Sequence, residues 1–595
     1  MKEGKTIRGV LLPVLIQDPA VAGESEAGSI VHPVIVKDSV GFTEGPTCRR
    51  VAVVDLDFNS GKLRRPATFD PRGSPYKGIA AYKVEVPTKR KTAKMPWARG
   101  RGKGVDIGEL GSIPLDDPFM KVSVFGTVLR TLGLIQDPAV LGREIPWGFP
   151  GKQLLVVPRA AEMDNAFYHR DSRSLQFYYG SSSPGHTVYS GLSQDIVAHE
   201  TTHAIIDGIA SDLYDAISPE SLAIHEGLAD LTAALLSMRN RELDHRRPKP
   251  MTAEEIRQSS RFSRIAEEFG RWRGHGEALR DVCNTKTLDT NAPADCRIDS
   301  SSPHSTSEVL SGLLFAVFSA LYKSAPDEPA LTRKINRVGA AAPEGLRQRM
   351  AYAVNRTLGL AYRGLDWLPP GDASFADLVA AMLAADREFF PDDPRVREGL
   401  SKEAGLRGIP IAEASQLFKR VKLPLDADMR QKFVERRRKA LGVPADARVK
   451  LILRKIHIYA PPLLPKSIGE GFDLKPDMSR LVSADTEHYL IKLAWWQREA
   501  NEVEGWGKHR RYRSGATIVV EKGGRIRAVL QNRDAATATA SRSGFLRLML
   551  AGESRTPQIG PDGVVLRRGL RASLKNDTLS IRGAMQALHV AGGLE

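Results

Sequence analysis

The sequence predicts an α+β protein of about three domains, and three observations support that prediction. Short apolar runs separated by glycine, proline and charged residues fill the first part of the chain. Long apolar patterns with helical spacing dominate the middle. The last third is strongly basic, whereas the rest is nearly neutral. At 595 residues, the chain is also too long for a single hydrophobic core.

Residues 1–115 are expected to form a β-rich N-terminal region. Apolar alternation predicts short strands at Ile30–Val36, Val51–Phe58 and Ile79–Val86. The run Arg8–Ile16 is also expected to be a strand, because it is interrupted by Pro13 and lacks the cleavage pattern of a secretion signal.

Composition and cysteine usage favour a cytoplasmic protein without a membrane span. The chain is 42% apolar and 26% charged, which is ordinary for a soluble globular protein. Its three cysteines, Cys48, Cys283 and Cys296, cannot all pair internally, although Cys283 and Cys296 could pair across one loop. An odd number suits a reducing compartment better than a disulfide framework. The sequence leaves the oligomeric state open.

Residues 116–408 are expected to form a second region with a helical second half. Its first elements are a helix over Asp117–Ile135 and a strand over Leu154–Val157. Long amphipathic patterns predict a helical bundle, at Glu308–Leu321, Gly345–Leu360 and Phe375–Phe389.

The segment His199-Glu200-Thr-Thr-His203 lies on an apolar helical stripe and carries the pattern of a zinc site. Two histidines four residues apart on a helix project from one face, so both imidazoles can bind one metal. Without a metal, such a pair on a core helix would be buried without partners. On the next apolar segment, Leu222–Leu236, Glu226 can supply the third ligand of a His2Glu zinc site, which keeps one position open for water. Glu200 would then be the general base of amide hydrolysis.

Further motifs, together with this segment, resemble the thermolysin family of zinc metallopeptidases, gluzincins in which an HExxH motif is followed by a glutamate ligand. The motifs are Asn165–Tyr168 followed by Leu175–Gly180, Tyr214 after the zinc helix, Gly276–Asp281, and the pair Asp299 and His304. The resemblance implies a two-lobed fold, with a β-rich N-terminal lobe, a helical C-terminal lobe and the zinc helix between them. It also implies one catalytic zinc and a polypeptide substrate.

The resemblance also implies roles for individual residues. Tyr214 and His304 would donate hydrogen bonds to the developing oxyanion, and Asp299 would orient His304. Asp230, one turn beyond Glu226, would orient His199. The residues expected to contact substrate are Asn165 and Ala166 on an edge strand that an extended peptide joins, Arg280 at a substrate carbonyl, and Ile196 and Leu279 around a hydrophobic residue on the leaving side of the cut.

Two features depart from the family's pattern, and one polar segment flanks the site. His225 stands where the family usually has asparagine; it could be an alternative ligand or a helix surface group, and the surface group is the preferred interpretation. After Asp230 the chain lacks the carboxylates that would gather calcium, so structural calcium is not expected and Asp195 is interpreted as a helix-start residue. The polar segment Arg239–Arg271 is interpreted as an insertion able to shape substrate access.

Residues 411–595 are expected to form a basic α+β accessory domain. They hold 34 lysines and arginines against 19 acids, whereas residues 1–410 hold 52 against 51. Gln431–Ala440 is a candidate basic helix, and Thr517–Leu530 a hairpin turning at Gly523-Gly524.

Two functions follow from these patterns. The favoured one is a zinc-dependent endopeptidase. The alternative is a binding protein that acts through the basic domain, on nucleic acid or an acidic partner, with the peptidase module as a scaffold. Positive charge near Trp495, Trp496, Trp506 and Tyr512 motivates it, although solvated basic surface is the more frequent outcome. The basic stretch Lys89–Lys103 is interpreted as an exposed loop.

Overall fold

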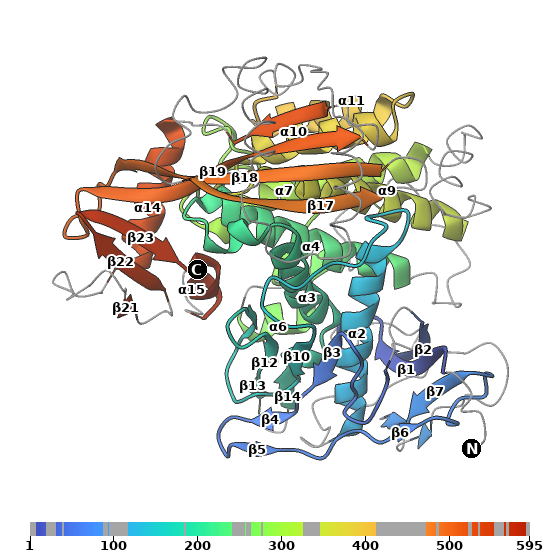
Figure 1. Ribbon diagram of the computed structural model, residues 1–595. Coiled ribbons are helices and arrows are strands. Elements are labelled where there is room, and N and C mark those ends of the chain that lie inside the picture. The colour runs from blue at the N-terminus through green and yellow to red at the C-terminus, as the bar shows by residue number, and fades with distance from the viewer. Residues whose placement is uncertain are drawn as a thin grey trace, which may run out of the picture.

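The computed structural model is mixed α and β, with β-sheet at both chain ends and helices between them (Figure 1). It describes residues 7–19, 31–37, 41–86, 93–94, 117–183, 186–240, 256, 263–274, 278–324, 346–411, 472–482, 487–521, 526–532, 536–551, 564–566 and 570–590.

The N-terminal region is β-rich, as predicted. Strand β1 (Gly9–Leu15) pairs antiparallel with β2 (Val31–Val36) and parallel with β7 (Ile79–Tyr82), so the predicted strand near the N-terminus is confirmed. This sheet packs against helix α2 (Pro118–Gln136), whose backbone N–H at Phe119 is capped by the Asp117 carboxylate. Shorter strands complete the region: β3 (Val51–Val53), β4 (Leu56–Asp57), β5 (Lys62–Leu63), β6 (Phe69–Asp70), β8 (Glu85–Val86) and β9 (Ala93–Lys94).

A second sheet has the strand order β11-β12-β10-β3. Its edge is β11 (Ala166–His169), which pairs antiparallel with β12 (Ser174–Phe177). Strand β10 (Leu154–Val157) has the predicted bounds and joins the sheet in parallel. A hairpin of β13 (Tyr179–Ser183) and β14 (His186–Tyr189) follows. The predicted edge strand therefore lies at a sheet edge, with one side free of strand pairing among the described residues.

The middle of the chain is helical, and the helices predicted there are confirmed, α10 with the predicted bounds. They are α3 (Gln194–Ile209), α4 (Pro219–Asn240), α7 (Pro303–Ser324), α9 (Leu346–Trp367) and α10 (Phe375–Phe389); a further helix, α11 (Arg395–Leu406), was not predicted. Short elements connect them: the 3₁₀ helices η2 (Ser190–Leu192) and η3 (Ser211–Asp215), helix α6 (Glu267–Trp272), and strands β15 (Arg264–Ile265) and β16 (Arg280–Asp281).

Two helices, α2 and α7, are long and apolar enough to cross a membrane by length and composition. The fold buries 83% and 78% of these windows, so their apolar surface is covered by the protein's own core. The three cysteines are free, so Cys283 and Cys296 do not form the bridge that their spacing left open.

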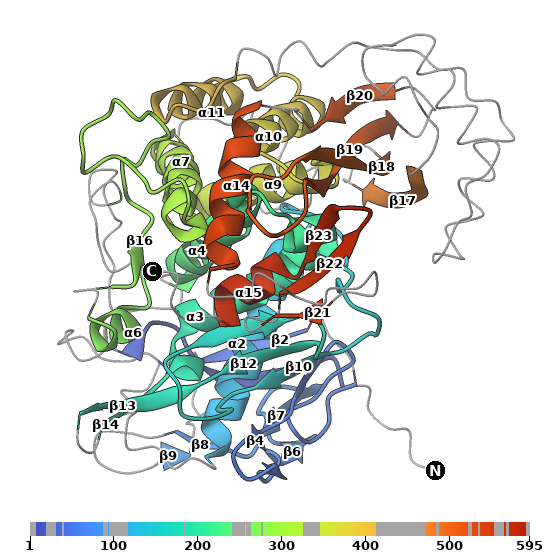
Figure 2. The same ribbon diagram turned by 90° about the vertical axis from the view of Figure 1, so that its left-hand side faces the viewer.

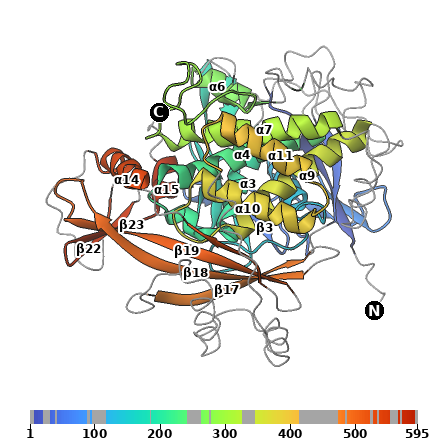
Figure 3. The same ribbon diagram turned by 90° about the horizontal axis from the view of Figure 1, so that it is seen from above.

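The C-terminal part is a twisted sheet with two helices. Strands β18 (Glu487–Ala500) and β19 (His509–Glu521) cross the helical layer on one side (Figure 3). Strand β20 (Ile526–Gln531) pairs antiparallel with β19, which confirms the predicted hairpin; its two turn glycines lie outside the described residues, as does the predicted helix Gln431–Ala440. The remaining elements are β17 (Phe472–Val482), β21 (Val564–Val565), β22 (Arg571–Lys575), β23 (Thr578–Arg582), α14 (Ala536–Met549) and α15 (Ala584–Val590).

Buried polar contacts join this C-terminal sheet to the helical layer. The Asn532 amide donates to the Pro370 and Asp372 carbonyls, and the Thr517 hydroxyl donates to the Leu368 carbonyl. At Gly371 the backbone has φ +99° and an added Cβ would lie 2.4 Å from the Arg513 carbonyl oxygen, so only glycine fits this approach. The sheet is thus held on the loop between α9 and α10. The domain boundaries near residues 115 and 410 adjoin residues outside the described ranges and stay predictions.

Candidate metal centre and cleft

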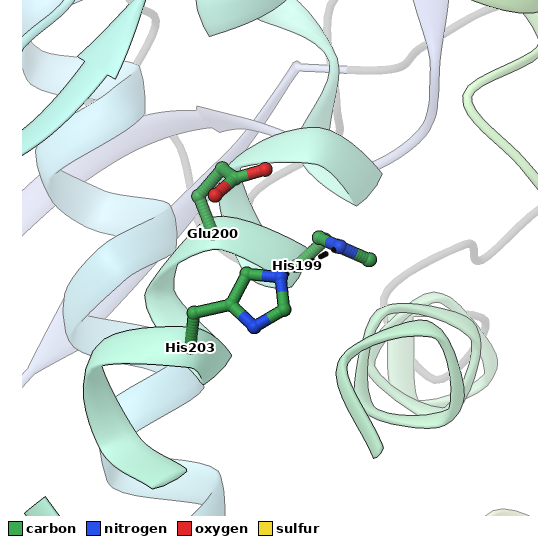
Figure 4. A group of neighbouring side chains, drawn as sticks. All are labelled: His199, Glu200 and His203. Atoms are coloured by element: carbon green, nitrogen blue, oxygen red, sulfur yellow. Dashed lines mark hydrogen bonds between the residues drawn. The ribbon is translucent and has the colours of Figure 1, made fainter. Parts of the chain in front are cut away.

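The first half of the candidate centre comes from α3. The Ser193 hydroxyl caps this helix by accepting a hydrogen bond from the Ile196 N–H. His199 and His203 then lie one turn apart, and their Nε2 atoms are 3.0 Å from each other (Figure 4). The rings meet edge to face, at 81°. The predicted convergence of the two imidazoles is therefore present.

Helix α4 supplies the other half. The Glu226 carboxylate is fully buried, with Oε2 3.4 Å from His199 Nε2 and Oε1 3.6 Å from His203 Nε2. One turn further, Asp230 Oδ1 lies 2.9 Å from His199 Nδ1. Two carboxylates are thus buried beside two imidazoles, and burying such charge is costly unless a cation or hydrogen bonds compensate it.

The spacing of these atoms fits a tetrahedral metal ion. Ligand atoms about 2.0–2.1 Å from a tetrahedral ion lie roughly 3.3–3.4 Å from each other. The three distances among His199 Nε2, His203 Nε2 and the Glu226 carboxylate are 3.0, 3.4 and 3.6 Å. Nitrogen and carboxylate oxygen are also donors that zinc accepts. These three residues could therefore hold a metal.

Each histidine has a partner on its outer nitrogen. Burial alone would lower the pKa of His199, but its hydrogen bonds to Asp230 and Glu226 outweigh burial and raise it to about 10. With Nδ1–H directed at Asp230, Nε2 is the atom that faces the centre, and a metal bound there would take the place of the Nε2 proton. His203 Nδ1 lies 3.4 Å from His225 Nδ1. If His203 donates there, its Nε2 lone pair also faces the centre.

His225 is not the surface group that was the preferred interpretation. It is fully buried, and its ring lies 5.6 Å from that of His203. Burial lowers the pKa of His225 to about 3. Its imidazole is therefore neutral and can accept a hydrogen bond from His203. The error arose because the local sequence around Glu226 does not reveal that α4 is covered on all sides.

We expect His225→Ala to weaken metal binding by about 10–100-fold, the usual effect of removing the partner that orients a ligating histidine. His225→Asn should retain most of the affinity, because an amide oxygen can accept the same hydrogen bond. Competition with a chromophoric chelator would measure both affinities. Equal affinity for wild type and His225→Ala would contradict this role.

Glu200 lies on the same helix and takes a different direction from the two histidines in Figure 4. Its Oε2 accepts a 2.9 Å hydrogen bond from the Tyr168 N–H of edge strand β11. Burial raises the pKa of the Glu200 carboxyl, and nearby His589 and His199 oppose that rise. A buried carboxylate with a raised pKa beside a metal centre is suited to accept and return a proton.

A cleft lies beside these residues, and most of the predicted site residues line it. The predicted residues along its wall are Asn165, Ala166, Ile196, His199, Glu200, Asp230, Leu279, Arg280 and His304. Residues from five separate segments thus converge on one cavity.

Arg280 and His304 lie together at one end of the cleft. Arg280 Nη1 is 3.3 Å from Asp230 Oδ1, and its Nη2 is 2.6 Å from His304 Nδ1. His304 Nδ1 is also 3.1 Å from Glu226 Oε2. Burial lowers the pKa of His304, which leaves it a neutral acceptor for the Arg280 guanidinium.

The predicted orienting role of Asp299 is not seen. Its carboxylate is exposed and accepts from the backbone N–H and the hydroxyl of Ser301, in the turn that precedes α7. Among the contacts of the described residues, none joins Asp299 to His304. The local turn satisfies the carboxylate, and Arg280, which donates to His304 Nδ1, positions the imidazole instead.

Tyr214 lies in η3 and its hydroxyl does not reach the cleft in this structure. The hydroxyl accepts from the Arg170 N–H at 3.4 Å, and the ring lies 3.9 Å below the Arg170 guanidinium. The cation–π contact and near-complete burial hold the ring there. Its proposed role as an oxyanion donor would require the hydroxyl to leave this position.

Four further residues line the cleft and were not predicted individually. Ile265, Ala266 and Phe269 belong to the described part of the segment Arg239–Arg271, and Arg273 follows it. The part of Arg239–Arg271 that the structure describes therefore does border the cleft. The C-terminal residues Leu588 and His589 also line it. Nothing in the sequence around His589 signals a site, because its nearest site neighbours are hundreds of residues away.

Asp195 is in the first turn of α3, as expected, but it belongs to a buried acidic cluster with Asp18 and Glu267. Their oxygens accept from Ser193, Ser237 and the Ala266 N–H, whereas Glu267 Oε2 has no partner. Burial and the neighbouring carboxylates raise the pKa of Asp195 to about 7 and that of Glu267 to about 9. The expected absence of structural calcium stays a prediction.

These raised pKa values predict that the free energy of unfolding falls as the pH rises. An acid whose folded pKa exceeds its unfolded pKa favours folding at low pH, and this contribution is lost as pH rises from about 4 towards 9. We therefore expect Glu267→Gln to raise the free energy of unfolding at pH 8 by on the order of 1–3 kcal/mol. The gain should vanish near pH 4 and be absent for exposed Glu504→Gln, as measured by urea titration. A destabilised Glu267→Gln protein at pH 8 would contradict this.

Comparisons with known proteins add little to this geometry. No protein family model matches the chain, and no curated protein does. Among solved structures, one match is the precursor of protealysin, a metalloproteinase from Serratia proteamaculans. The match has 15% sequence identity and a TM-score of 0.33, and covers 55% of this chain and 88% of that chain. At this level the match assigns no activity to the present chain.

Proposed function

We propose that the protein is a zinc-dependent endopeptidase. The observation that carries the proposal is the convergence of His199, His203 and Glu226 from two buried helices, with Glu200 beside them at a cleft. A His2Glu donor set with an open fourth position is typical of catalytic zinc. A zinc ion bound there would polarise the scissile carbonyl and lower the pKa of a water towards about 7.

The chain's own residues supply the rest of the reaction. Glu200 accepts the proton of the attacking water and passes it to the leaving nitrogen, so no covalent intermediate is needed. The Tyr168 N–H holds one oxygen of this carboxylate and leaves the other available. His304 at the end of the cleft is the better-placed donor to the oxyanion, since Tyr214 is turned away.

Edge strand β11 supports a polypeptide substrate. An extended peptide can add to a sheet edge through main-chain hydrogen bonds, which makes binding tolerant of sequence. Asn165 and Ala166 border the cleft beside this edge. Such a geometry favours unfolded segments over compact domains.

The proposal is tested by metal analysis and cleavage of an unstructured polypeptide. The purified protein should bind about one zinc per chain, as a single His2Glu site requires. A strong chelator should abolish cleavage, and added zinc should restore it. Stoichiometric zinc without hydrolysis of any unfolded polypeptide, by the intact chain or by a variant lacking its C-terminal helix α15, would refute the proposal.

We also expect hydrophobic residues on the leaving side of the cut. Ile196, Leu279 and Phe269 provide apolar surface along the cleft, so an apolar side chain gains by burial there. Mass spectrometry of peptide-library products would give the preference, and Leu279→Ser should weaken it by about tenfold. A map dominated by charged residues on that side would contradict the assignment.

The alternative function through the basic C-terminal part is less well supported. Trp506 and Tyr512, two of the aromatic residues that motivated it, are buried, and Tyr512 packs under Arg542. Trp496 lies 4.3 Å from the Arg511 guanidinium. These rings already have partners within the protein and do not form a free stacking surface.

A further inference from the structure

The C-terminal helix α15 lies in the cleft of the candidate centre. Figure 2 shows α15 below α14 and beside α3, the helix that carries His199 and His203. Helix α15 contacts edge strand β11 and η3. From this helix His589 Nε2 approaches to 2.9 Å from Glu226 Oε1. Its ring centroid is 4.7 Å from that of His203 and 6.0 Å from that of His304. His203, Glu226 and His589 bring their ligand atoms within 4.8 Å of one another.

Several contacts hold the helix in this place. The Asn165 amide donates to the His589 carbonyl at 2.9 Å, and the Gly583 N–H donates to Asp215 Oδ1 at 2.8 Å. Met585 and Leu588 bury their side chains. Arg571, on the strand pair before α15, forms an exposed ion pair with Asp171 near the edge strand. The helix is thus anchored at both of its ends.

We propose that His589 is a fourth protein ligand of the metal, so that α15 is an internal plug that closes the active site. This inference rests on the proposed function. A zinc site with four protein ligands is closed, whereas hydrolysis requires one position for water. His589 presents its Nε2 to Glu226 Oε1, and His203, Glu226 and His589 form a group of close ligand atoms that shares two members with the three-ligand set.

The plug also occupies the substrate's place. Asn165 donates to a main-chain carbonyl of α15, which is the type of bond that an extended substrate would offer at this edge. Leu588 and His589 of α15 line the same cleft as Asn165, Ala166 and Glu200, so the helix takes up wall space that a bound polypeptide would need. With α15 in place, the intact chain is therefore a latent enzyme.

Release of α15 would open the site without unfolding the rest. The helix has only seven residues, and apart from the His589–Glu226 contact the described hydrogen bonds that hold it are the one from Asn165 and the one that Gly583, just before the helix, donates to Asp215. Displacement by a competing polypeptide, or cleavage before Gly583, would remove His589 from the centre. Either event changes the ligand set from three histidines and one carboxylate to two histidines and one carboxylate.

Cobalt-substituted full-length protein provides the test, because the visible absorption of Co²⁺ reports its ligands independently of activity. The wild type, His589→Ala and His589→Gln would each be titrated with azide, which binds an open metal position. Gln586→Ala, a partly exposed position on the same helix, is the matched control. We expect azide to shift the spectra of both His589 variants but not those of the wild type and the control.

The same proteins loaded with zinc would be assayed on an unstructured polypeptide. Hydrolysis by the two His589 variants should exceed that of the wild type and of Gln586→Ala by at least about tenfold, since an open site no longer needs the plug to dissociate. A chain ending before Gly583 should behave like the His589 variants. Zinc affinity of these variants should fall by roughly tenfold, because one ligand is lost.

The outcomes separate this inference from the proposed function. If azide shifts the wild type and the variants alike and hydrolysis is equal, His589 is not a ligand while the peptidase proposal stands. If His589→Ala and His589→Gln bind metal but lose hydrolysis, His589 takes part in the reaction and the plug is wrong. If no protein in the set binds cobalt or zinc, both proposals fail.

Discussion

Replacing Glu200 by glutamine in the His589→Ala background should lower the rate of polypeptide hydrolysis by about 10²–10⁴-fold, the range for loss of a general base. The amide keeps the shape of the side chain and can still contact the Tyr168 N–H, but it cannot accept the proton of a water. Because Glu200 is not one of the three converging ligands, zinc content should stay unchanged. The measurement is kcat with metal analysis on the same sample.

The opposite outcome would contradict the assignment of Glu200 as the general base. A Glu200→Gln protein that keeps zinc and hydrolyses as fast as its parent would show that another group takes the proton. His304 also lines the cleft and is the candidate, and His304→Gln in the same background would identify it.

Replacing Glu226 by glutamine should have the largest effect on the metal. The carboxylate touches His199, His203, His304 and His589, and it is the only acid among the three converging ligands. A neutral amide is a weaker zinc ligand, so affinity should fall by more than the roughly 10–100-fold that follows loss of an orienting partner. The loss of zinc affinity in Asp230→Asn should stay within roughly 10–100-fold, because Asp230 acts through His199.

Chelator competition on the two variants would rank these effects. If Asp230→Asn loses more affinity than Glu226→Gln, the carboxylate at position 226 is not a direct ligand. Circular dichroism must show that both variants are folded, since the metal-free site already buries these acids among histidines and Arg280.

Much of the site was predictable from local sequence because its parts lie on periodic elements. On a helix, the four-residue spacing of His199 and His203 places both side chains on one face. Glu226 and Asp230 follow the same rule on the next helix. The bounds of β10 and α10 were also predicted, since apolar patterning marks where buried strands and helices begin and end.

The structure departs from the sequence expectations where three-dimensional contacts override local pattern. Tyr214 has the expected position in the chain, but the Arg170 guanidinium and N–H hold its ring away from the cleft. The turn at Ser301 captures the Asp299 carboxylate. Burial of His225 depends on how helices pack around α4, and the approach of His589 depends on a chain segment hundreds of residues from the motif. No periodic pattern in the sequence reveals the burial of His225 or the approach of His589.

X-ray absorption at the zinc edge of the intact protein tests the central claim most directly. The account predicts about one zinc per chain, bound by nitrogen and oxygen at about 2.0–2.1 Å, with the outer-shell scattering of three imidazoles and without sulfur. His589→Ala should reduce the imidazole scattering to that of two rings. Absence of zinc, or a zinc bound by cysteine sulfur, would contradict the assignment of His199, His203 and Glu226 as the metal centre.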